Sequence, residues 1–310
     1  MTVLIAGSTG LVGSALVNTF ENAGHDVVGI SRTVVDLLDL EAITEFVRKV
    51  KPALIVDAAA KVGGIGANSS SPVEFLSDNL RVQNNLMEAA HRAEVEGFIF
   101  LGSSCIYPRD CAQPIKEEYL MTGPLESTNS AYAVAKIAGI ELIKAYRKEY
   151  GTKWISLMPT NLYGPKDNFN LSVSHVLPAF IRRFVEAAQT NAPKVILWGS
   201  GSPKREFLHV DDLAHAVLLA SDKYDSSMHL NIGTGQDLTI KELAHKVAAV
   251  AGFVGEIEWD RSKPDGTPRK VLDVAKVKTL GWEPTITLDE GIASTISWYK
   301  AASSKGEVRK

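Results

Sequence analysis

Tyr132 and Lys136 stand four residues apart in the segment SAYAVAKIAG, a spacing that places both side chains on one face of a helix. A phenol with its ordinary pKa near ~10 exchanges protons poorly at neutral pH, and a neighbouring ammonium lowers that pKa. A tyrosine and a lysine at this spacing are also common on solvated helix faces. Ser103 favours chemistry, because it ends the apolar run GFIFLGSS and can hydrogen-bond the same reacting oxygen. The three residues predict an oxidoreductase site.

A glycine motif near the amino terminus predicts the cofactor. GSTGLVG follows the apolar run VLIAG and precedes an expected helix, so that glycines permit a tight turn and the close approach of a pyrophosphate. A purely structural turn is the alternative, and the flanking strand and helix argue against it. The cofactor contacts predicted in this turn are Gly7, Ser8, Thr9, Gly10, Leu11, Val12 and Gly13.

The residue after the second expected strand indicates which nicotinamide cofactor is used. Many such folds place an acidic residue there to bind the ribose hydroxyls, whereas GHDVVGISRT supplies Arg32. A cation at that place suits a 2′-phosphate, so we expect NADP rather than NAD. An ordinary solvated arginine is the alternative.

The elements that must position these residues alternate between short apolar runs and amphipathic helices, which predicts an α/β fold with a doubly wound parallel sheet, the Rossmann type. Ligands bind beyond the carboxyl ends of such strands. We expect an NADP-binding domain at 1–165 and a smaller, mainly substrate-binding lobe at 166–310, with the chain crossing back to the first domain. The expected strands are 3–7, 25–30, 53–60, 97–104, 154–161 and 194–199, and the expected later helices lie near 175–190, 211–222, 239–251 and 288–301.

Composition limits the partners. The 310 residues carry a formal net charge of −3 with both signs interspersed, so no basic tract suggests nucleic acid or an anionic membrane. The amino terminus is apolar but lacks a positive leader, which fits a signal peptide or membrane span poorly. Two cysteines, Cys105 and Cys111, are too few for a disulfide framework and favour a reducing cytoplasm. We expect no metal ion.

The chain resembles the extended short-chain dehydrogenase/reductase family, which has this glycine spacing, a serine on the fourth strand and a Tyr-x-x-x-Lys helix. The resemblance covers most of the chain. Several segments are similar to the branch of 3,5-epimerase-4-reductases that convert GDP-4-keto-6-deoxy-D-mannose, with NADPH, into GDP-L-fucose: SSCIYP, NSAYAVAKIAG, MPTNLYGPKDNF, SHVLPAFIRRF and WGSGSPKREFLHVDD.

Epimerisation beside a ketone requires two proton carriers, and this resemblance implies which residues they are. Cys105 is a plausible base once ionised, and His175 is the matching acid near neutral pH. Without the motifs, a small buried thiol and a helix-capping histidine would be the simpler interpretations. Ser103 and Tyr132 offer two hydrogen-bond donors to the C4 oxygen while it carries enolate charge, and Tyr132 protonates it in the final reduction.

The resemblance also implies the remaining contacts. A GDP group brings a pyrophosphate and a flat base, for which we expect Arg183, Arg205, Trp198 and Asp265 in the second lobe. Solvated or salt-bridged surface side chains are the alternative for the two arginines. On the cofactor side, the resemblance adds the glycine-containing loop AAAKVGGI and the following residues: Leu101, Gly102, Ser103, Ser104, Lys136, Pro159, Thr160, Asn161, Leu162 and His175.

Quaternary structure and rival functions complete the expectations. Family members pair the helix that bears Tyr132 into a homodimer, although core packing explains its apolar residues Ile137, Ile140 and Leu142 equally well. Other nucleotide-sugar enzymes of the same family would share the serine, tyrosine and lysine. A 4-epimerase has no need of Cys105 and His175 as proton carriers, and a 4,6-dehydratase would want an acidic residue near the serine, where this sequence has SCI at 104–106. A non-enzymatic NADP sensor would have little reason to keep the catalytic residues together.

Overall fold

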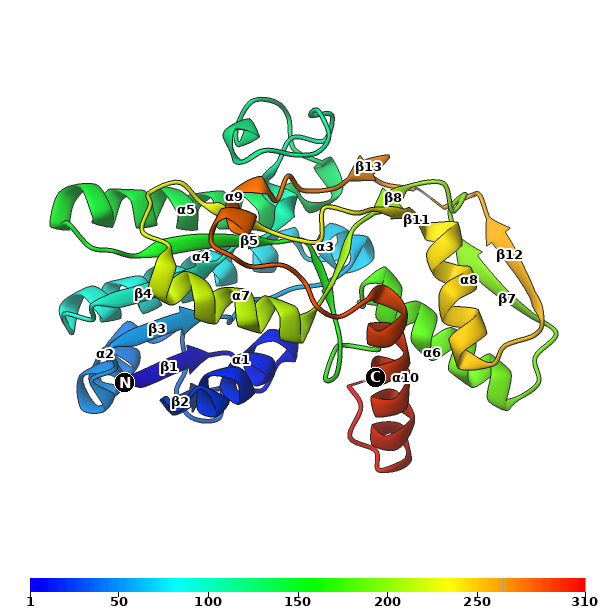
Figure 1. The fold of residues 1–310 in the computed structure, drawn as a ribbon, viewed down its shortest axis with the longest axis horizontal. Coiled ribbons are helices and arrows are strands. Elements are labelled where there is room, and N and C mark those ends of the chain that lie inside the picture. Colours follow the sequence, from blue (N-terminus) through cyan, green and yellow to red (C-terminus); the bar gives the residue numbers. More distant parts are fainter. Residues whose placement is uncertain (264, 310) are drawn as a thin grey trace.

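A parallel sheet of six strands forms the centre of the molecule in the computed structural model, which describes residues 1–263 and 265–309 (Figure 1). The strands lie in the spatial order β10, β5, β4, β3, β1, β2, and every pairing is parallel. The predicted doubly wound sheet is therefore confirmed. Its strands are β1 (Thr2–Ala6), β2 (Asp26–Ile30), β3 (Leu54–Asp57), β4 (Gly97–Leu101), β5 (Ile155–Pro159) and β10 (Leu230–Ile232).

Helices cover both faces of this sheet, because each crossover between parallel strands runs over a face. On one face α4 packs against α2 and α5, and elsewhere α1 packs against α7. The bounds are α1 (Leu11–Asn22), α2 (Leu40–Val50), α3 (Ile65–Ser70), α4 (Pro72–Arg92), α5 (Ser130–Tyr150) and α7 (Val210–Lys223). Single turns of 3₁₀ helix span Ser104–Ile106, Glu117–Tyr119 and Ser127–Asn129.

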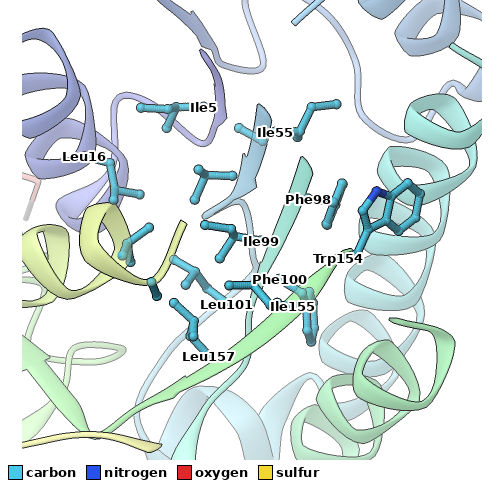
Figure 2. Packing of buried hydrophobic residues seen from close by; sticks show 14 of the residues in the cluster. Ile5, Leu16, Ile55, Phe98, Ile99, Phe100, Leu101, Trp154, Ile155 and Leu157 are labelled. Atoms are coloured by element: carbon cyan, nitrogen blue, oxygen red, sulfur yellow. The ribbon is translucent and has the colours of Figure 1, made fainter. Parts of the chain in front are cut away.

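The core explains why the strands read as continuous apolar runs. Figure 2 shows Ile5 of β1, Ile55 of β3 and Ile99 of β4, and all three side chains are buried. Phe98 and Trp154 pack with ring centroids 5.2 Å apart, and both rings are buried. Each such side chain contributes about 1.5–3 kcal/mol to folding through burial. This packing fixes the carboxyl ends of β1, β3, β4 and β5 in one row.

A second hydrophobic cluster lies in the later part of the chain, where Phe180 and Phe184 of α6 pack near Val247 of α8. Short strands pair beside it: β7 with β12, β6 with β9, and β8 between β11 and β13. The helices are α6 (Val176–Gln189), α8 (Ile240–Ala251), α9 (Ala275–Thr279) and α10 (Leu288–Ser304). The strands are β6 (Asn161–Tyr163), β7 (Lys194–Trp198), β8 (Lys204–Arg205), β9 (Phe207–His209), β11 (Leu238–Thr239), β12 (Glu256–Asp260) and β13 (Arg269–Lys270).

The later half also returns to the sheet. Strand β10 pairs with β5, and α7 contributes Leu213 and Val217 to the first cluster. The division into 1–165 and 166–310 stays a prediction, since neither cluster is confined to one side of it. Among the described residues, none of the helices has the length and apolar composition that crossing a membrane requires.

Candidate active site

The turn between β1 and α1 is built for a close backbone approach. Gly7 has φ +76°, in the left-handed region, and a Cβ there would lie 2.7 Å from the carbonyl oxygen of Ala58. A Cβ on Gly13 would lie 2.1 Å from the carbonyl oxygen of Gly7. Helix α1 then begins after Gly10, which has no side chain to cap the first amides. These amides and the helix dipole form a site that fits a pyrophosphate.

The segment after β2 supplies a free cation. Arg32 is exposed two residues beyond the end of β2, and it forms no ion pair with any residue that the structure describes. Asp39, seven residues later, instead caps α2 by accepting the amides of Glu41 and Ala42 at 3.1 Å. The geometry around β2 therefore leaves Arg32 available for a phosphate.

Tyr132 and Lys136 lie in the first two turns of α5, as their spacing predicts. The ammonium of Lys136 is buried, donates to the carbonyl oxygen of Leu101 at 2.9 Å and lies 5.9 Å from the centroid of the Tyr132 ring. Ser103 follows β4 and hydrogen-bonds Tyr132, which lowers the tyrosine pKa. The structure thus brings all three predicted residues to the end of β4.

The protonation state of Tyr132 differs from the sequence-based expectation. Burial raises the pKa of Tyr132 above its ordinary value, and the charges of Cys105 and Asp57 raise it further. The hydrogen bond from Ser103 is the opposing influence, and Lys136 is not among the causes. A raised pKa makes the phenol a weaker acid than free tyrosine, so at neutral pH Tyr132 is a protonated hydrogen-bond donor.

Cys105 lies in the 3₁₀ turn directly after β4. Its amide donates to Ser103 Oγ at 3.3 Å, so the serine also caps the turn. Two side chains contact the sulfur: Asn129 Nδ2 at 3.5 Å and Lys270 Nζ at 3.8 Å. A cation beside a cysteine favours the thiolate, which is the form that removes protons.

His175 occupies the position before the first turn of α6 and makes no side-chain cap. Its side chain is accessible to water, yet the surrounding protein lowers its pKa by desolvation. Two residues before His175, the carbonyl oxygen of Val173 accepts a hydrogen bond from the amide of Gly64 at 2.9 Å. This bond holds the segment against the loop after β3.

Two backbone segments predicted to contact the cofactor lie side by side. Leu101–Ser104 follows β4 and Pro159–Leu162 follows β5, and the amide of Gly102 donates to Leu157 at 2.9 Å. The amide of Thr160 in turn donates to Ile232 of β10 at 3.0 Å. Both segments therefore lie at the carboxyl edge of the sheet, where ligands bind in such folds.

Three of the four predicted substrate residues come together in the later part of the chain. The charges of Cys105, Glu126 and Asp265 all act on Arg205, whose pKa is lowered mainly by burial. Asp265 accepts both the amide and the hydroxyl of Ser200 at 2.7 Å, in the turn after β7. Trp198 ends β7 and is 60% exposed, with Lys263 Nζ 5.6 Å from its ring centroid.

Arg183 is the predicted substrate residue that the structure does not bring to this group. It is half-buried on α6, the helix that follows His175, and has no ion-pair partner in the described parts of the chain. The structure therefore leaves its guanidinium available without bringing it against the cluster around Arg205.

Several residues of the site were missed by sequence reasoning. Lys270 reaches Cys105 from a point 165 residues away in the chain, which no local pattern reveals. Asn129 could have been noticed as a polar residue within the motif NSAYAVAK. Asp57 carries a clearer signal, since a charged residue directly after three buried apolar residues of a central strand is unusual. Glu206, which is fully buried, accepts the amides of Gly235 at 2.7 Å and Leu272 at 2.9 Å and joins the later segments.

Comparison with known proteins is consistent across sequence and structure. The model of the NAD dependent epimerase/dehydratase family matches residues 3–233. A relative from Oryza sativa subsp. japonica, "Probable GDP-L-fucose synthase 1", is 52% identical over 299 residues, which cover 96% of this chain and 91% of the relative.

Two solved structures are closely similar. A GDP-L-fucose synthetase from Naegleria fowleri bound to NADP has a TM-score of 0.91 at 29% identity and covers 100% of this chain and 96% of its own. A GDP-6-OMe-4-keto-L-xylo-heptose reductase from C. jejuni has a TM-score of 0.92 at 33% identity and covers 97% of each chain. No cluster of three or more potential metal-ligating side chains occurs within residues 1–263 and 265–309.

Proposed function

The chain belongs to the GDP-L-fucose synthases of the NAD dependent epimerase/dehydratase family, and from this premise we propose how its residues carry out the reaction. The enzyme is an NADP-dependent 3,5-epimerase and 4-reductase that converts GDP-4-keto-6-deoxy-D-mannose to GDP-L-fucose. One observation supports the assignment of residues most strongly: the thiol of Cys105 lies beside Lys270 at the end of the strand that also presents Ser103 to Tyr132.

The cofactor fits the turn after β1 and the edge of the sheet. The α1 amides and the turn from Gly7 to Gly13 would hold the pyrophosphate, and Arg32 would hold the 2′-phosphate. Lys136 would bind the nicotinamide ribose, while Leu101–Ser104 and Pro159–Leu162 line the nicotinamide half. When bound, NADPH supplies the hydride that reduces C4.

Epimerisation precedes reduction and needs only proton transfers. The Cys105 thiolate takes the proton from the carbon next to the ketone, and the electron pair moves onto the C4 oxygen as an enolate. Ser103 and Tyr132 donate hydrogen bonds to that oxygen and stabilise its charge. His175 then gives a proton to the opposite face of the carbon. Before the second carbon reacts, Cys105 releases the abstracted proton to solvent and His175 takes up a proton from solvent, so that the same two transfers can occur again. Lys270 holds the thiolate ready between these steps.

Reduction uses the same donors. Reduction turns the C4 oxygen into an alkoxide, which is more basic than a phenolate, so Tyr132, which is protonated at neutral pH, passes its proton to that oxygen. Lys136 and Ser103 keep the phenol oriented. One carbonyl pocket thus serves all steps without release of the sugar.

The lobe at 166–310 would bind the GDP part of the substrate. Arg205 and Arg183 are suited to the pyrophosphate, and the exposed indole of Trp198 offers a surface for the guanine. Asp265 supports the turn after β7 through Ser200, so we assign it an indirect contact, through the loop that it holds.

A homodimer and a cytoplasmic location complete the proposal. Helix α5 exposes Val134 (45%) and Tyr150 (53%), whereas Ile140 is fully buried and belongs to the core. The exposed face of α5 would pair with its copy, and replacing Val134 by lysine should shift the molar mass in light scattering from dimer to monomer. Cys105 and Cys111 are both free thiols, which favours a reducing compartment.

The decisive experiment incubates the purified protein with NADPH and GDP-4-keto-6-deoxy-D-mannose and identifies the sugar by NMR. Formation of GDP-L-fucose with one NADPH oxidised per sugar is expected. Reduction that leaves both C3 and C5 in the D-sugar configuration would instead identify a 4-reductase without epimerase activity. Incorporation of solvent deuterium at both carbons distinguishes the two directly.

A further inference from the structure

Asp57 is a buried charge that the reaction scheme above does not use. It is the last residue of β3, and only 1% of its surface is exposed. One carboxylate oxygen, Oδ1, accepts the amide of Ala59 at 3.1 Å. The other, Oδ2, is buried without a hydrogen-bond partner among the described residues. Such a group is rare in a folded protein, because burial strongly disfavours a carboxylate that is incompletely bonded.

The sheet register places this carboxylate on the face that carries Lys136. Asp57 pairs with Phe100 of β4, and paired residues of parallel strands project their side chains to the same face. Lys136 Nζ lies 4.6 Å from the centroid of the Phe100 ring. The two groups form no ion pair in the described chain, but both are buried, so little water screens the influence of each charge on the other.

The remaining groups around Asp57 are neutral or already paired. The neighbouring strands contribute Ala6 and Phe100 in register. Tyr132 and Lys136 come from α5. In the loop that follows β3, Lys61 is engaged by acidic residues of α4, Glu74 and Asp78.

Electrostatics couples Asp57 to the catalytic helix in both directions. Burial raises the pKa of Asp57 to about 6, and Lys136 opposes that rise. Burial lowers the pKa of Lys136, and Asp57 opposes that fall. The Asp57 carboxyl is therefore ionised at neutral pH, where it favours the charged form of the lysine.

We propose that Asp57 is a positioning residue that acts through Lys136, its buried negative charge keeping the lysine charged so that the ammonium can bind the nicotinamide ribose and orient Tyr132. This inference rests on the roles proposed above for Lys136 and Tyr132. The simpler alternative is that Asp57 only closes the turn after β3 through its bond to Ala59.

Asp57→Asn separates the two interpretations, because asparagine keeps an oxygen for the Ala59 amide and removes the charge. The rate of NADPH oxidation by substrate is measured for the variant and the wild type from pH 5.5 to 9.5. On the alkaline side of the profile, where the rate falls as Lys136 loses its proton, the fall should begin about one pH unit lower in the variant, which makes its rate there roughly tenfold lower. The variant and the wild type should converge below about pH 6, where Asp57 of the wild type binds its own proton. A penalty that is constant with pH, or no penalty, would overturn the proposal.

Asp167→Asn is the matched control. Asp167 is also buried, accepts the amide of Asn168 at 2.7 Å and has an unpartnered Oδ2. It lies beyond β6, and Lys136 is not among the groups whose charge acts on it, so its replacement should leave the pH profile of reduction unchanged. An equal shift of the profile in both variants would show that Asp57 acts only through general stability.

A second readout needs no substrate and decides the matter if Asp57→Asn folds poorly. Since the pKa of Asp57 is higher in the folded than in the unfolded chain, ionisation of this group reduces stability as the pH rises through about 6. In thermal melts of Lys136→Met, the decrease of stability with pH should continue to a higher pH than in the wild type. In the double variant with Asp57→Asn, this additional decrease should disappear. Identical pH dependence of the single and double variants would refute the coupling. Failure of the wild type to form GDP-L-fucose would refute the proposed function and leave these melts interpretable.

Discussion

Replacing Lys270 by methionine tests the chemistry of the thiol most directly. Lys270 Nζ lies 3.8 Å from Cys105 Sγ. At an effective dielectric constant of about 20, a unit charge pair at this separation interacts by roughly 4 kcal/mol. Lys270 is only half-buried, so solvent screening reduces this interaction to about 1–3 kcal/mol. Because a neighbouring cation favours the thiolate, losing an interaction of this size should slow proton removal by Cys105 about 10- to 100-fold.

The assay follows solvent deuterium entering C3 and C5 of the substrate, observed by NMR without NADPH so that reduction does not interfere. Lys270→Met should slow this exchange about 10- to 100-fold at pH 7, in proportion to the lost thiolate. The deficit should shrink as the pH rises, because the thiol of the variant then ionises unaided. Lys246→Met is the control, since Lys246 is paired with Asp289 in the second lobe. Normal exchange in Lys270→Met, or a deficit that does not change with pH, would refute the role of this lysine.

Three further changes probe the cofactor end and the reduction. In the proposed scheme, Tyr132→Phe removes the group that protonates the C4 oxygen, so steady-state formation of GDP-L-fucose should fall about 10²- to 10⁴-fold. Deuterium exchange should fall less. Comparable losses in the two assays would contradict a special role of Tyr132 in reduction. Arg32→Ser should raise the KM for NADPH about tenfold or more and leave the KM for NADH unchanged, and a parallel rise for both would show that Arg32 does not bind the 2′-phosphate. Gly13→Ala introduces a Cβ only 2.1 Å from the Gly7 carbonyl oxygen, so NADPH affinity measured by fluorescence titration should collapse, whereas unchanged affinity would show that the turn can open without consequence.

The central sheet could be predicted because its strands carry their own signal. VLIAG and GFIFLGSS are apolar runs bounded by glycine or serine, and burial on both faces is what makes such runs continuous. The predicted ends were less accurate: the runs at 53–60 and 97–104 stop as strands at Asp57 and Leu101. Strand β10 has three residues and no distinguishing pattern, and only its pairing with β5 creates it.

The candidate site, like the sheet, has parts that could be predicted from the sequence and parts that could not. Tyr132, Lys136 and Ser103 come together because a helix period and the end of a parallel strand fix their positions, and both are readable from sequence. The direction of the Tyr132 pKa was not readable, since it depends on the depth of burial and on Asp57 from another strand. Lys270 was equally hidden, because the pairing of β13 with β8 places it and the sequence records no such pairing.

The contact between Lys270 and Cys105 also bears on the order in which the active site forms while the chain is being synthesised. Cys105 is synthesised early, and its stabilising ammonium follows 165 residues later. A nascent chain that has already formed the first strands and the glycine turn therefore carries this thiol without its cation. The cation that favours the thiolate reaches Cys105 only after β13 has been synthesised and has paired with β8, so the active site is completed by one of the last segments of the chain.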